Sequence, residues 1–65
     1  MMTESEIQHI LVKMMLAVDG ALDEIVLHIE DDELLDIFHH GMKLIEAVED
    51  ATGKTALEHY LEVVS

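Results

Sequence analysis

Apolar residues recur at every third or fourth position along most of this chain, which is the spacing of one face of an α-helix. The first series runs from Ile7 to Ile29 and keeps its phase across Asp19 and Gly20. We therefore expect one long helix over residues 4–29, with two shorter helices capped at Gly20 as the alternative. A second series spans residues 34–48, and a third, short one spans residues 57–64.

Capping signals bound these segments, because each offers a side chain or backbone suited to a helix end. The capping residues are Thr3 with Glu6, Asp31 or Asp32, Gly53, and Thr55 with Glu58. The short polar connection after the first helix predicts an antiparallel pair. The expected fold is all-α, a long antiparallel helical hairpin plus a short C-terminal helix, forming one domain over residues 1–65. The expected core residues are Ile7, Leu11, Met14, Val18, Leu22, Ile25, Leu34, Phe38, Ile45, Val48, Leu57 and Leu61.

The apolar content exceeds what so small a bundle can cover. Of 65 residues, 51% are hydrophobic and none is cysteine, so disulfides cannot compensate for a small core. A second apolar stripe lies opposite the main one on the first helix. Its residues are Val12, Leu16, Gly20 and Leu27. We interpret them as a self-association face that pairs two hairpins into a dimeric helical bundle; scattered surface residues are the alternative.

The charge restricts the partners that such a module can have. Fifteen acidic residues against three lysines and no arginine give a net charge of -12, which repels nucleic acid and anionic membranes and favours a basic protein surface. The longest apolar run, Met14 to Val18, is too short for a membrane span. We expect a cytoplasmic protein, of a cell or an infected host. The acidic residues expected to contact the partner are Asp19, Asp23, Glu30, Asp31, Asp32, Glu33 and Asp36.

Catalytic and cofactor motifs find little support. Gly53, Lys54 and Thr55 match the end of a phosphate-binding loop, but the required earlier glycine is replaced by Val48. Asp36 with His39 has the spacing of a helical metal motif, and His40 could join it, yet these residues face solvent on the expected helix. We therefore expect no enzyme and no cofactor, and keep a small metal-binding protein as a minor alternative.

Two functional hypotheses remain. In the first, the chain is a non-enzymatic acidic protein-interaction module, an inhibitor that occupies a basic cleft; in charge and size alone it is similar to small phage-type inhibitors and nucleic-acid mimics. In the second, it is a structural or regulatory helical homodimer, or a subunit of a larger assembly, that uses its second apolar face.

Overall fold

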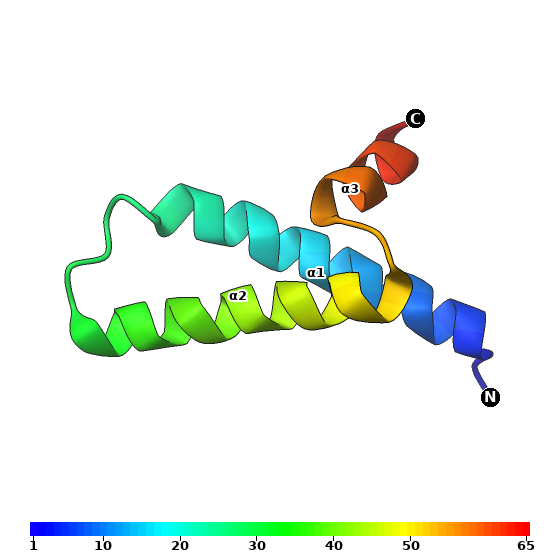
Figure 1. The fold of residues 1–65 in the computed structure, drawn as a ribbon, viewed down its shortest axis with the longest axis horizontal. Coiled ribbons are helices and arrows are strands. Elements are labelled where there is room, and N and C mark those ends of the chain that lie inside the picture. The colour runs from blue at the N-terminus through cyan, green and yellow to red at the C-terminus, as the bar shows by residue number, and fades with distance from the viewer.

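The computed structural model describes residues 1–65 and is all-helical (Figure 1). Helix α1 spans Glu4–Ile25, α2 spans Asp32–Thr52 and α3 spans Ala56–Val64. Helices α1 and α2 form an antiparallel hairpin, and α3 turns back from the end of α2 to pack against α1. No helix combines the length and the apolar composition that crossing a bilayer requires.

The predicted caps are present. The Thr3 hydroxyl accepts a hydrogen bond from the Glu6 amide at 3.1 Å, and Asp31 accepts one from the Glu33 amide at 2.8 Å. Gly53 ends α2 in the left-handed conformation, at φ 72°. These contacts satisfy backbone groups that a helix end otherwise leaves unpaired.

Helix α1 runs unbroken through Gly20, which confirms a single first helix, but it ends at Ile25 rather than at Ile29. Its last turn contains no basic residue, so nothing offsets the negative end of the helix dipole. Residues 26–30 instead reverse the chain, and Asp31, whose backbone is extended, is the N-cap of α2.

The core lies where the three helices meet. Val12 and Met15 of α1 and Val48 of α2 are buried, with Leu16, Ile45 and Ala56 packed against them. His59 of α3 is the fourth buried residue. Near the connection between α1 and α2, the two helices leave an apolar hollow of about 360 Å³.

The predicted core face of α1 is wrong in the N-terminal half of the helix. Ile7, Leu11 and Met14 are exposed, whereas Met15 is completely buried. Helix α3 docks on the side that carries Val12 and Leu16, so the contact face is rotated away from the main apolar stripe. Of the other expected core residues, Val48 is buried, Val18, Leu22, Phe38 and Ile45 are half-buried, and Ile25, Leu34, Leu57 and Leu61 are exposed.

Gly41 allows the hairpin helices to approach closely. A Cβ atom there would lie 3.1 Å from Leu22 Cδ2 and 3.4 Å from Val18 Cγ1. This contact sets the register, because it places the middle of α2 opposite the C-terminal half of α1.

Candidate functional site

One groove on the hairpin combines acidic walls with an apolar floor. We call it the acidic groove, a hollow of about 290 Å³ between α1 and α2. Its residues are Asp19, Leu22 and Asp23 of α1, and Phe38, Met42, Ile45, Glu46 and Glu49 of α2. Carboxylates thus come from both helices, while the side chains between them are aliphatic or aromatic.

Asp19 and Asp23 also border a second hollow on the other side, towards α3. That hollow is lined by Leu16, Gly20, Ala56, Leu57 and Tyr60 as well. The two aspartates are one helical turn apart, so their side chains lie about 6 Å apart along α1. They therefore form an acidic ridge between two partly apolar hollows.

The carboxylates of the groove have no cationic partner within the chain. Lys54 with Glu62 is the one ion pair in the structure, and it lies outside the groove. Glu49 is partly engaged, because one of its oxygens accepts a hydrogen bond from the Ala56 amide at 2.6 Å. Asp19, Asp23 and Glu46 are left free to meet cations from outside.

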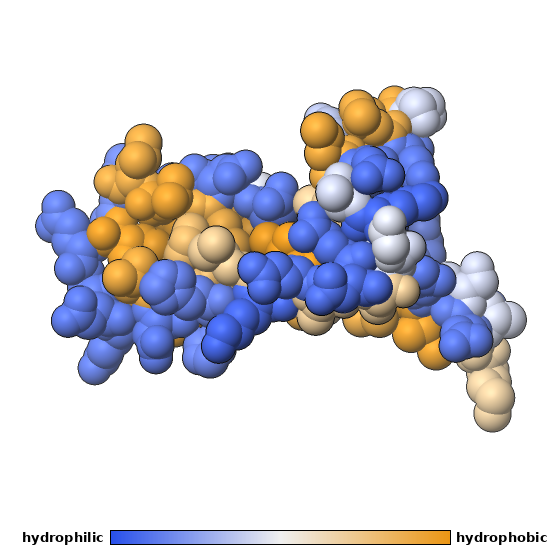
Figure 2. All heavy atoms as spheres, in the orientation of Figure 1, coloured by the Kyte–Doolittle hydropathy of each residue, from blue (hydrophilic) through white to orange (hydrophobic).

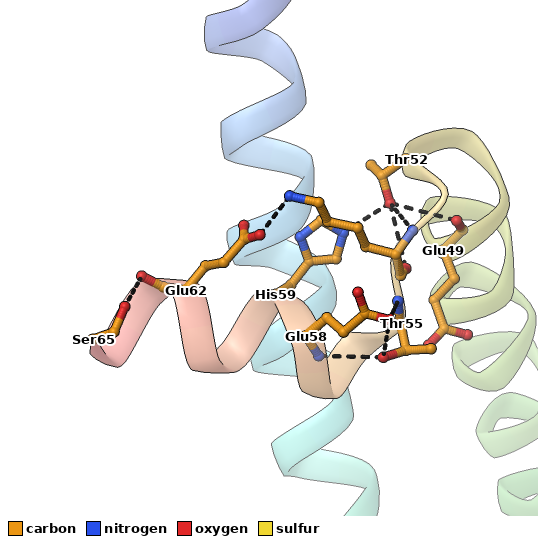
Figure 3. A network of polar contacts seen from close by, with 8 residues as sticks. Glu49, Thr52, Thr55, Glu58, His59, Glu62 and Ser65 are labelled. Carbon is orange, nitrogen blue, oxygen red and sulfur yellow. Dashed lines mark hydrogen bonds and ion pairs between the residues drawn. The ribbon is translucent and has the colours of Figure 1, made fainter.

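The α2–α3 junction holds a polar network that fixes α3 (Figure 3). The Thr52 hydroxyl donates to the Val48 carbonyl at 2.9 Å and lies 2.7 Å from His59 Nε2. A hydroxyl has one proton to donate, so when Thr52 donates to the Val48 carbonyl it accepts from His59 in the tautomer that carries hydrogen on Nε2. The buried imidazole is thereby satisfied and held against α1 and α2.

An ion pair reinforces the same junction from outside. The hydrogen bond to the Glu62 carboxylate, with its negative charge, raises the pKa of Lys54. The same hydrogen bond, followed by the positive charge of Lys54, lowers the pKa of Glu62. Both groups border a polar hollow of about 540 Å³ with Ser5, Gln8, His9 and His59. The His59–Thr52 contact and the Lys54–Glu62 ion pair thus join α3 to the rest of the chain.

The acidic residues expected to bind a partner fall into two groups. Asp19 and Asp23 are brought together in the groove. The others are Glu30, Asp31, Asp32, Glu33 and Asp36, which lie exposed in the connection and the first turns of α2. Of these, Asp31 serves as the N-cap, and Asp32 and Glu33 lie in the first turn, where negative charge is favourable.

The groove residues of α2 were missed as a site. The sequence shows Glu46 one helical turn before Asp50. The residues around Glu46 do not indicate that it lies across from Asp19 and Asp23. That pairing depends on the hairpin register, which the contact of Gly41 with Leu22 sets.

The predicted self-association residues are distributed differently. Val12 is buried in the chain's own core and Leu16 packs against it, because α3 covers this side of α1. Nothing lies within 4 Å of a Cβ built on Gly20, and Leu27 is 90% exposed beyond the end of α1. Val12 and Leu16 are therefore used within the chain.

The weak metal candidates Asp36, His39 and His40 are exposed on α2. Nowhere in the chain do three or more histidine, aspartate or glutamate side chains gather in an arrangement able to hold a metal ion. Phe38 contacts His39 edge to face, with the ring centres 6.2 Å apart.

Comparisons with protein-family models, curated proteins and solved structures found no match for this chain.

Proposed function

We propose that this chain is a non-enzymatic acidic interaction module whose acidic groove binds a basic, amphipathic segment of another protein. The observation that supports it is the composition of the groove: unpaired carboxylates from two helices flank Leu22, Phe38, Met42 and Ile45. Such a surface suits a helix with lysine or arginine on both sides of an apolar stripe.

The floor of the groove adds selectivity to the charge. Met42 is 44% exposed, and its flexible thioether can adapt to different apolar side chains. Charge alone would attract any cationic surface, whereas an apolar floor favours a partner that also buries hydrophobic side chains there.

The acidic ridge suggests what kind of basic protein this is. The spacing of Asp19 and Asp23 is close to that of successive phosphates in a nucleic-acid strand. A protein that handles nucleic acid presents lysine and arginine at that spacing. The proposal therefore extends to an inhibitor that occupies a nucleic-acid-binding cleft and competes with its nucleic acid.

The test uses a synthetic helical peptide with lysines flanking a leucine stripe, and a second peptide with the same lysines but glutamine in place of leucine. We expect the leucine peptide to bind more tightly by calorimetry, and its affinity to fall as salt rises because salt screens the charge pairs. The double variant Asp19→Asn/Asp23→Asn should bind about tenfold more weakly, through the loss of two partly screened charge pairs.

The matched control is Glu30→Gln/Asp36→Asn, which removes the same charge from exposed positions outside the groove. It should change the affinity about twofold or less, since only long-range attraction is altered. Equal weakening by both double variants, or equal binding of the two peptides, would contradict a defined groove.

A further inference from the structure

The folded chain leaves an unusually large surface exposed for its mass. Its accessible area is 5203 Å² for 7.3 kDa. A monomeric protein of this mass typically exposes about 4,200 Å², so the excess is about 1,000 Å². One subunit of a standard protein–protein interface buries about 800 Å². The surplus is therefore of the size that a dimer contact removes.

Exposed apolar side chains also follow one side of α1. We call this side the outer face of α1, comprising Ile7, Ile10, Leu11, Met14 and Ile25. Met14 and Leu16 lie about 200° apart around the helix axis, and Leu16 borders the hollow shared with α3. The outer face thus points away from α3, and all five of its residues are exposed, whereas Val18 nearby packs against Gly41 of α2.

The outer face is uncharged and partly lined by small residues. Ala17 and Ala21 complete it at helical spacing, and small side chains let a second helix approach closely. Through Ile25 it continues into an apolar hollow of about 360 Å³ at the open end of the hairpin. Figure 2 shows apolar side chains gathered over this end of the molecule.

We infer that a second copy of this chain covers the outer face, so that two hairpins form a four-helix bundle about a two-fold axis. Because each chain has a net charge of -12, two copies repel each other. Self-association therefore favours an uncharged contact such as the outer face of α1. The middle of the face, near Met14 and Ala17, then meets its own counterpart. None of the outer-face residues lines the acidic groove, so the groove stays open in this dimer.

The test compares two methionine substitutions by analytical ultracentrifugation across a concentration series. Met14 is 41% exposed and Met42 is 44% exposed, so neither supports the monomer core. Met14→Glu should raise the dimer dissociation constant by at least about tenfold, since a two-fold contact buries the new charge twice. Met42→Glu adds the same charge in the groove and should leave the dissociation constant within about twofold, because its effect is only long-range.

Salt separates this inference from the proposed function. Raising the salt concentration should tighten the dimer, by screening the repulsion between two acidic subunits, while it weakens binding of the basic peptide. A wild-type chain that stays at 7.3 kDa at high salt and high concentration overturns the dimer. Equal effects of the two glutamate substitutions on mass also overturn it, including the case in which both unfold. Neither result bears on whether the groove binds peptide.

Discussion

Met15 is the one large side chain that this structure buries completely. Its neighbours Val12 and Val48 complete a very small core, so each of the three carries a large share of the stability. The adjacent Met14 is exposed, since it lies on the outer face of α1.

Met15→Ala should therefore lower the free energy of unfolding by about 2–4 kcal/mol, through lost burial and the cavity that remains. For a domain of this size that is a large part of the total. Urea titration followed by circular dichroism measures it. The control Met42→Ala, in the groove, should change it by about 0.5 kcal/mol or less; equal losses would show that the core lies elsewhere.

Two exposed glycines should respond to alanine with opposite signs. Gly20 lies inside α1 with open space around its Cβ position, so Gly20→Ala should stabilise the fold by about 0.5–1 kcal/mol. Gly53 has φ 72°, and Gly53→Ala should destabilise it by about 1 kcal/mol, because a Cβ is unfavourable there. Thermal melts of the two variants measure these changes, and a loss of stability in Gly20→Ala would contradict the open space around this position.

At the scale of the element, α3 is the helix that depends most on its neighbours. Nine residues are too few for a stable isolated helix. It is held by its capping box, by the hydrogen bond between His59 and Thr52, and by the ion pair of Lys54 with Glu62.

This ion pair predicts a pH dependence. The pKa of Glu62 is lowered in the folded chain, so its contribution is present above the ordinary value of 4.5 and is lost as the pH falls through the lower folded value. The pKa of Lys54 is raised, so the loss at high pH comes only above 10.5. The wild type should exceed Glu62→Gln in melting temperature at pH 7, and the difference should vanish in acid. Asp50→Asn, which removes an exposed acid with no ion pair, should not melt below the wild type at pH 7.

Local signals in the sequence were enough to place the helices but not to orient them. The caps at Thr3, Asp31 and Thr55 depend on residues two or three positions away, and all three were predicted. Whether Met14 or Met15 is buried depends on where α3 docks. The spacing of apolar residues along α1 carries no information about that docking. Asp19 and Asp23 are one turn apart on the same helix, so their proximity could be predicted. That Glu46 and Glu49 lie beside them could not, because it depends on the register of the hairpin.

At the scale of the whole molecule, repulsion among like charges is the main electrostatic effect on stability. A net charge of -12 with a single internal ion pair disfavours the compact state. Raising sodium chloride from about 20 mM to about 500 mM should therefore raise the melting temperature, because the Debye length falls to a few ångströms. Sucrose at matched osmolality controls for solvent effects, and an equal response to both would refute the electrostatic cause.

The small core at the meeting point of the helices also determines how the chain must acquire its structure. The four buried residues, Val12, Met15, Val48 and His59, come from all three helices, so no two helices contain all of them. Closing such long segments costs chain entropy before any burial compensates for it. We expect folding in one concerted step, in which neither the isolated hairpin nor the last helix persists as a stable half.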